Sequence, residues 1–145
     1  MKSKLSMAAT VAATIAMAVP AAAHHSFAMY DRTQARTLTG KLTRFIPGAN
    51  HAQLIFELID ETGRPIVGDD GNPVAWGVET GPAAQIADQG ITVRSFPVGT
   101  VVTVTLNPLR DGRPFGALAG SVIRCGVELP AGGCNAETGE SFGGN

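Results

Sequence analysis

Five short segments with the residue pattern of β-strands, and one helical segment between the third and the fourth, constrain the fold of this chain most. Alternating apolar and polar residues bounded by glycine and proline are typical of half-buried strands. The expected strands are Arg36–Phe45, His51–Ile59, Val74–Glu79, Val101–Leu106 and Phe115–Ile123, with Val127–Leu129 as a further short one. Gly40, inside the first strand, indicates a bend or a bulge.

The helical segment runs from Ala83 to Gln89, with Pro82 before its first turn and Gly90 just past its end. This element order favours an all-β fold with one short helix, namely a small five-stranded Greek-key barrel of the OB type. A small β-sandwich is the alternative. Six strands at most are few for an immunoglobulin-like sandwich, and the Cys…Trp…Cys spacing of that fold does not occur in the sequence.

Residues 1–23 have the three-part pattern of a cleavable signal peptide: a basic start, the uncharged run Leu5–Val19, and small residues up to Ala23. The run has 15 residues, whereas a membrane-spanning helix needs about 20. We therefore expect cleavage, a location in the periplasm or outside the cell, and no membrane span in the mature chain. Residues 24–134 are then one domain, and the glycine-rich polar tail 135–145 is expected to be mobile.

Charge and cysteine content narrow the possible partners and the compartment. Removal of Lys2 and Lys4 with the signal leaves 9 basic and 12 acidic residues, a net charge of −3. Without a basic patch, nucleic acids and anionic membranes are not expected as partners. Cys125 and Cys134 are the two cysteines, and in an oxidising compartment we expect them to form a disulfide.

Several short motifs follow one another along the chain, each occurring once. They are Ala23-His24-His25-Ser26-Phe27, Thr37-Leu38-Thr39-Gly40, Asn50-His51, Trp76-Gly77-Val78-Glu79, Val98-Gly99-Thr100-Val101-Val102-Thr103-Val104 and Pro108-Leu109-Arg110-Asp111-Gly112. In these motifs the chain resembles a family of small exported bacterial proteins whose domain has no known function. The chain departs from the family pattern at the turn Pro47–His51, at Ile91, in the cysteine pair and in the loop Val67–Pro73. The resemblance implies an exported β-barrel and supplies no activity.

The three histidines, His24, His25 and His51, are the candidate metal ligands. Cleavage after Ala23 would make His24 the first residue, so its α-amino nitrogen (pKa near ~7.7–8.0) and its ring Nδ1 would chelate a metal together. A second imidazole completes a nitrogen-rich site suited to Cu(II), with zinc or nickel as alternatives. This arrangement resembles a histidine brace. Cleavage after Ala21 instead places His24 third, which also favours copper or nickel. In the competing interpretation, His24 and His25 belong to a polar N-terminal arm, and His51 is a turn residue that binds no metal.

Trp76, Glu79 and Arg110 form a second candidate site, a polar pocket. Residues three apart on a strand face opposite sides, so Trp76 is expected to pack against the barrel and Glu79 to face away from it. A functional interpretation pairs Glu79 with Arg110 or His51. The structural interpretation makes Glu79 a strand-end residue and Arg110-Asp111-Gly112 a solvated hairpin turn.

No hydrolase, phosphate-binding or dinucleotide motif occurs in the sequence, so we assign no catalytic residue. Three functions follow, in order of preference. The first is an exported protein that binds copper or a related metal, the one cofactor candidate. The second is a periplasmic barrel that binds a small molecule or a partner protein without metal. The third is an enzyme of unknown type.

Overall fold

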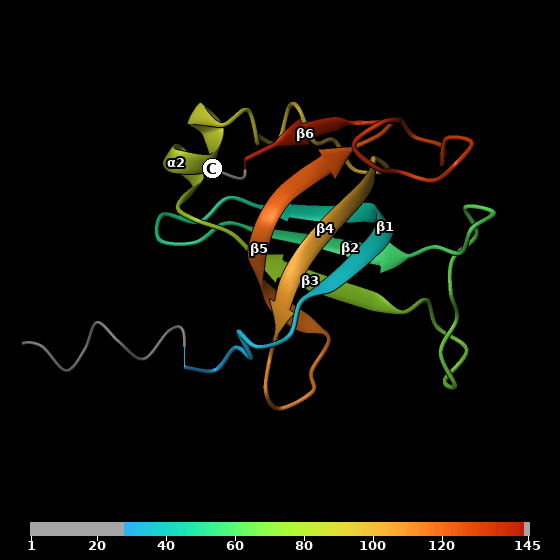
Figure 1. Ribbon diagram of the computed structural model, residues 1–145, viewed down its shortest axis with the longest axis horizontal. Coiled ribbons are helices and arrows are strands. Elements are labelled where there is room, and N and C mark those ends of the chain that lie inside the picture. Colours follow the sequence, from blue (N-terminus) through green and yellow to red (C-terminus); the bar gives the residue numbers. More distant parts are fainter. Residues whose placement is uncertain (1–27, 144–145) are drawn as a thin grey trace, which may run out of the picture.

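The computed structural model describes residues 28–143, where six strands and one α-helix follow the expected order (Figure 1). The elements are β1 (Arg36–Ile46), β2 (Gln53–Leu58), β3 (Ala75–Glu79), α2 (Ala83–Asp88), β4 (Val101–Pro108), β5 (Phe115–Arg124) and β6 (Glu140–Phe142). The prediction of a mostly β fold with one short helix is confirmed.

The sheet closes on itself through its third and fifth strands. The strand order is β3-β2-β1-β4-β5-β6, with antiparallel pairing between neighbours, and β3 also pairs in parallel with the first part of β5. Strands β1 to β5 therefore form a closed barrel, and β6 is an extra strand on the end of β5. This closure, with α2 between β3 and β4, is the OB-type arrangement that the element order predicted.

Strand β1 pairs along both edges, and its pairing with β2 is irregular. Its first part pairs with β4, its second part pairs with β2, and its register with β2 shifts between Leu42 and Arg44. At Gly40 a β-carbon would collide with the carbonyl oxygen of Glu57 and the ring of Phe56. The absence of a side chain at Gly40 thus allows β1 and β2 to approach closely. The bend or bulge expected at Gly40 is not found there, because the register shift lies between Leu42 and Arg44.

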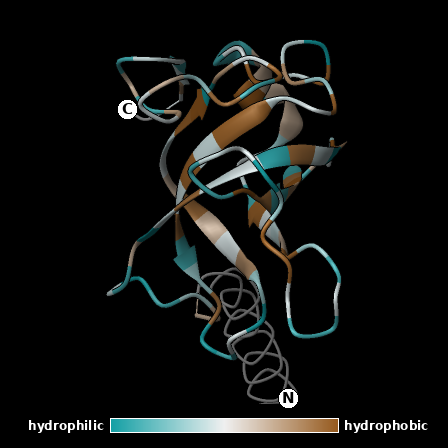
Figure 2. Cartoon of the chain, turned by 90° about the vertical axis from the view of Figure 1, so that its right-hand side faces the viewer, coloured by the Kyte–Doolittle hydropathy of each residue, from teal (hydrophilic) through white to brown (hydrophobic). Residues whose placement is uncertain are grey.

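Figure 2 shows hydrophobic and hydrophilic positions interspersed along the strands. The residues that alternate inward fill the barrel interior. The fully or almost fully buried members are Leu42, Leu54, Phe56, Val78, Val102, Val104, Leu106 and Val122, joined by Ile86, Ile91 and Phe96 from the helix and the segment after it. Full burial of each such side chain stabilises the fold by roughly 1.5–3 kcal/mol. The helical segment therefore covers one end of this core.

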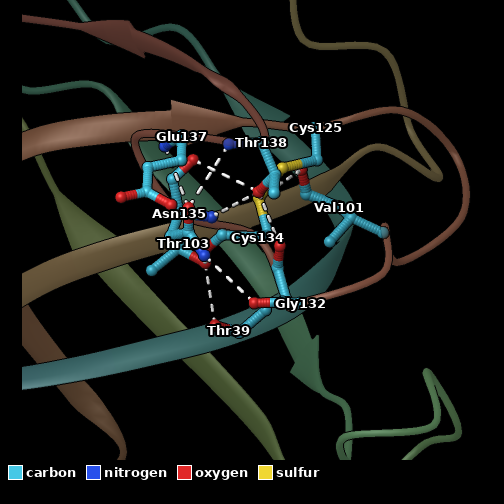
Figure 3. The surroundings of a disulfide bond; sticks show 10 residues. Thr39, Val101, Thr103, Cys125, Gly132, Cys134, Asn135, Glu137 and Thr138 are labelled. Carbon is cyan, nitrogen blue, oxygen red and sulfur yellow. Dashed lines mark hydrogen bonds between the residues drawn. A yellow bond between two sulfur atoms is a disulfide. The ribbon is translucent and has the colours of Figure 1, made fainter.

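The predicted disulfide between Cys125 and Cys134 is confirmed, and it holds a loop against β4 (Figure 3). The hydroxyl of Thr103 donates a hydrogen bond of 2.7 Å to the carbonyl oxygen of Cys134. Ile59, Val101 and Cys134 form a second, smaller apolar cluster beneath this loop. The disulfide loop therefore covers a face of the sheet that would otherwise meet solvent.

Two C-terminal expectations differ from the structure. Val127–Leu129 is not a strand but part of the disulfide loop, because the backbone pairing of Val101 ends at Cys125 and Gly126. We expected residues 135–145 to be mobile, but Glu140–Phe142 forms β6.

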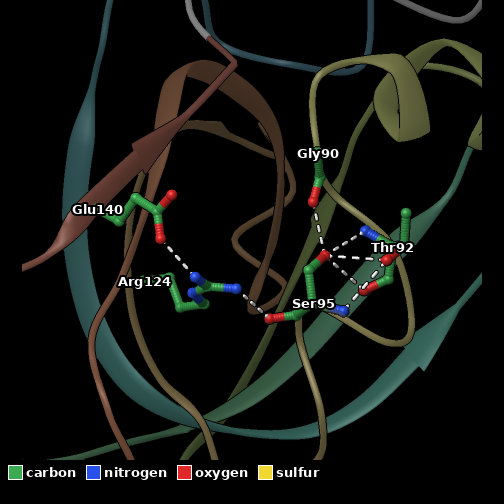
Figure 4. A network of polar contacts seen from close by, with 5 residues as sticks. All are labelled: Gly90, Thr92, Ser95, Arg124 and Glu140. Atoms are coloured by element: carbon green, nitrogen blue, oxygen red, sulfur yellow. Dashed lines mark hydrogen bonds and ion pairs between the residues drawn. The ribbon is translucent and has the colours of Figure 1, made fainter.

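Arg124 explains why this part of the tail is ordered. Its guanidinium lies over the rings of Phe96 and Phe142, at 5.7 and 4.7 Å from their centroids. It also pairs with Glu140 and donates a 2.7 Å hydrogen bond to the carbonyl oxygen of Ser95 (Figure 4). One cation therefore joins β5, β6 and the segment after α2.

Candidate functional site

The candidate site lies on the outer face of the barrel where β2, β3 and β5 meet. Gln53, Glu79 and Ala117 are neighbours in register across these three strands. The residues beside them in β2 and β3, Leu54 and Val78, are fully buried in the core, so Gln53 and Glu79 face outward. In OB-type barrels this face of strands 2 and 3, with the loops that follow strands 1 and 4, is where ligands bind.

Glu79 is the central side chain of this site, and His51 lies beside it. The Oε1 atom of Glu79 is 3.5 Å from Nδ1 of His51, and the two side chains are 20% and 41% exposed. His51 Nδ1 is also 3.2 Å from the carbonyl oxygen of Thr80. In the tautomer with the proton on Nδ1, this nitrogen donates to that oxygen, and Nε2 carries the free lone pair that a metal or a proton can take.

Tyr30 also contacts Glu79, and the sequence did not single it out. This residue is only 2% exposed. Burial raises the pKa of the Tyr30 phenol to about 12, and the negative charge of Glu79 and a hydrogen bond to its carboxylate add to the rise. The phenol is therefore protonated at neutral pH and donates to Glu79.

Arg110 holds the segment that brings Tyr30 to this site. Its backbone N–H donates to the carbonyl oxygen of Met29 at 2.9 Å, and its Nε donates to that of Ala28 at 3.2 Å. Tyr30 and Leu109 form an isolated antiparallel bridge next to these bonds. Arg110 thus anchors residues 28–30 beside β3, and its guanidinium binds this segment's backbone.

Trp76 lies on the opposite face of β3 from Glu79, as the spacing of three residues required. It is partly buried against the barrel core, opposite Phe56 in register. The guanidinium of Arg36 lies 5.7 Å from the centre of its ring. Of the three residues of the predicted polar pocket, Glu79 is therefore at the site. Arg110 binds the backbone of residues 28–29, and Trp76 is partly buried against the barrel core on the opposite face of β3.

Glu79 lines two recesses in the surface. The first, of about 430 Å³ and here called the Tyr30 recess, is lined by Met29, Tyr30, Gln53, Glu79, Leu109, Arg113, Pro114 and Phe115. The second, of about 310 Å³ and here called the His51 recess, is lined by His51, Glu79, Thr80, Gly81, Pro82, Gln85, Ala117 and Leu118. The Glu79 carboxylate therefore lines both recesses, on the outer face of β2 and β3.

The candidate metal ligands are only partly within the described chain. His51 is at the site, whereas His24 and His25 lie outside the described residues. Within residues 28–143 no three histidine, cysteine, aspartate or glutamate side chains come together as a metal site. This part of the chain contributes His51 and its neighbour Glu79 as potential donors.

The structure also bears on the compartment. A disulfide such as Cys125–Cys134 favours an oxidising, extracytoplasmic location. Within the described part of the chain, no helix combines the length and the apolar character needed to cross a membrane. The expected signal peptide, residues 1–23, lies outside the described residues.

Neither the curated proteins nor the solved structures gave a match. The model of a family of unknown function, DUF6152, matches residues 12–118, well over half of the chain. The chain therefore belongs to the DUF6152 family, a family of unknown function.

Proposed function

We propose that this protein is an exported binding protein that holds copper, or a related late transition metal, on the Glu79 face of the barrel. His24, His25 and His51 would be the ligands. The observation that carries the proposal is that two parts of the chain meet at Glu79. Residues 28–30 lie beside it, held by Arg110, and the imidazole of His51 lies next to its carboxylate. The segment that follows the histidine pair therefore lies on the same face of the barrel as Glu79, beside which His51 also lies.

Covalent geometry makes this convergence attainable. An extended chain spans at most ~3.3–3.6 Å per residue. His25 precedes Ala28 by three residues, so its Cα lies within ~11 Å of the Ala28 Cα, and that of His24 within ~14 Å. Ala28 itself is bound by Arg110 next to the Tyr30 recess. A terminal amine and two imidazoles can therefore reach the same face as His51.

The surroundings of His51 suit a metal ligand. Metal-binding histidines usually donate their second ring N–H to a carbonyl or carboxylate oxygen, which fixes the ring and the tautomer. His51 Nδ1 has both kinds of oxygen close by, those of Thr80 and Glu79. The Glu79 carboxylate also adds negative charge that favours a bound cation. Imidazole and amine nitrogens together are the ligand set that favours Cu(II).

The test is a copper titration of the secreted, correctly processed protein, with its N-terminus established by intact mass. Calorimetry measures affinity and stoichiometry, and electron paramagnetic resonance shows the nitrogen ligands. We expect one copper per chain, no tight binding when residues are added before the N-terminus, and weaker binding by His51→Ala. The loss should be roughly tenfold or more, since even the supporting partners of metal ligands are worth roughly 10–100-fold.

Asn50→Ala is the matched control, because Asn50 is exposed in the same turn as His51. It should bind copper as the wild type does. Weak binding that is indifferent to the N-terminal extension would overturn the proposal.

A second candidate function is a small-molecule-binding barrel in which the histidines have no part. The Tyr30 recess favours it, since its volume of about 430 Å³ is that of a small-ligand site.

A further inference from the structure

We propose that the Tyr30 recess binds a small organic cation, a protonated amine carried on a short apolar body, with the carboxylate of Glu79 holding the ammonium group. This site goes beyond the proposed copper function and does not require it. It also identifies the class of molecule that the second candidate function would take.

The size and position of the recess indicate a ligand site. Its volume of about 430 Å³ falls in the range of roughly 300–1,000 Å³ typical of small-ligand clefts. It lies on the outer side of β2 and β3 and reaches the loop between β4 and β5, which supplies Arg113 and Pro114. Strands 2 and 3 and this loop form the ligand-binding face of OB-type barrels.

The charge of the recess favours a cation. Two charged side chains line it, Glu79 and Arg113. Arg113 is 70% exposed and is paired with Asp111 at 2.8 Å, so its charge is compensated outside the recess. Within residues 28–143 the ion-pair partner of Glu79 is His51, which is charged only when protonated. The Glu79 carboxylate, 20% exposed, therefore presents negative charge in a partly desolvated place, where attraction to a cation is stronger than in water.

The hydrogen-bonding groups can accommodate an ammonium ion. A carboxylate has about four acceptor sites, and among residues 28–143 Tyr30 and His51 are the polar neighbours of the Glu79 carboxylate. The remaining sites can accept N–H donors from the ligand. Gln53 lies directly opposite Glu79 in the register of β2 and β3 and lines the same recess, so its amide oxygen offers another acceptor.

The other walls favour an apolar body. Met29, Leu109 and Phe115 line the recess with hydrocarbon and thioether surface. The Phe115 ring packs directly over Gly77, which leaves room for it because a β-carbon there would collide with the ring. An aromatic wall next to a carboxylate suits a ligand with an aromatic or short aliphatic group attached to an amine.

The test uses three probes of nearly equal size but different charge: benzylamine, benzyl alcohol and benzoate. Binding is followed at neutral pH, with a chelator present, by amide chemical shifts in nuclear magnetic resonance spectra. We expect saturable binding of benzylamine with shifts at Gly77, Glu79 and Phe115. Benzyl alcohol should bind more weakly by roughly tenfold or more, because the charged hydrogen bond is lost. Benzoate should not bind.

Glu79→Gln should weaken benzylamine binding by roughly tenfold or more for the same reason. Glu57→Gln is the matched control, since Glu57 lies on the same outer face of β2 but opposite Ala75, away from the recess. Each variant is compared with the wild type in thermal unfolding so that loss of binding is not loss of fold. Phe115→Leu should weaken benzylamine and benzyl alcohol alike, which separates the apolar wall from the charge.

The copper proposal and this one fail in different ways. A protein extended at its N-terminus should lose tight copper binding but keep benzylamine binding. Copper binding without saturable benzylamine binding would overturn only the amine site. Equal binding of the three probes, or equal effects of Glu79→Gln and Glu57→Gln, would also overturn it.

Discussion

The carboxylate of Glu79, at the end of β3, lies 3.5 Å from the imidazole Nδ1 of His51, in the turn before β2, although the two residues are 28 positions apart. Burial raises the pKa of the Tyr30 phenol, and the charge of the same carboxylate and a hydrogen bond to it add to the rise. Glu79 therefore links the turn before β2, the end of β3 and the segment before β1. A substitution of Glu79 should therefore change the pKa of the Tyr30 phenol.

The titration of Tyr30 tests this link directly, because Tyr30 is the one tyrosine of the chain. Its pKa should be about 12 in the folded protein, against about 10 in an unfolded chain. Absorbance of the phenolate measures it. Glu79→Gln should lower this pKa, since the negative charge that opposes ionisation is removed, and Glu57→Gln should leave it unchanged. A tyrosine that titrates at its ordinary pKa in the wild type would contradict the described contact.

The sign of the effect on stability follows from the raised pKa. The folded state holds the phenolic proton more tightly than the unfolded state does. The stabilisation is therefore fully present below about pH 10 and is lost as the pH rises from about 10 through 12. Unfolding by urea at several pH values measures this loss, and Tyr30→Phe should remove the part of it that comes from the phenol.

A substitution at Gly40 tests the close approach of β1 and β2. Gly40→Ala should destabilise the fold by about 1–3 kcal/mol or more, because the new methyl group has no room between the Glu57 carbonyl and the Phe56 ring. Gly120→Ala on β5 is the matched control, since nothing lies within 4 Å of a β-carbon there. That change should be neutral or slightly stabilising. Equal unfolding free energies for the two variants would show that the close approach of β1 and β2 does not limit the fold.

Local sequence patterns predicted the fold, but they predicted only some of the residues at the site. Alternation along Val101–Leu106 and the proline and glycine around α2 are local signals, and they predicted the elements and their order. His51 and Glu79 were identified by residue type. Tyr30 carried no such signal, because its place beside Glu79 depends on backbone bonds from Arg110. Contacts between residues so far apart in the sequence leave no periodic pattern in either segment, so neither segment alone predicts them.

The C-terminal segment shows the same limit. Glycine-rich, polar residues after Asn135 are typical of a mobile tail. The order of Glu140–Phe142 comes instead from Arg124, whose guanidinium contacts both Glu140 and Phe142. Phe142 alone, in a polar tail, does not indicate a strand. Its role becomes clear only from its contacts with Phe96 and Arg124.

The disulfide should stabilise the fold without taking part in binding. Cys125 and Cys134 are nine positions apart, and closing a loop of this length contributes about 2–3 kcal/mol in the chain-entropy model. Replacing both cysteines with serine should lower the free energy of urea unfolding by that amount. Copper and benzylamine affinities should stay unchanged, because the disulfide loop covers β4 rather than the Glu79 face. Altered binding in a variant that is still folded would connect the loop to the site.

The packing of Phe142 determines whether β6 stays on the barrel. The ring of Phe142 contacts that of Phe96 edge to face, with centroids 5.0 Å apart, and lies against the Arg124 guanidinium. Phe142→Ala removes both contacts, so we expect faster amide hydrogen exchange at Val122 and Arg124, which face β6 in the sheet. Ser141→Ala is the matched control, because Ser141 is exposed in the same strand. Protection at Phe115–Ala117, the part of β5 that pairs with β3, should remain. Loss of protection along the whole of β5 would instead mean that β6 is needed for closure of the barrel.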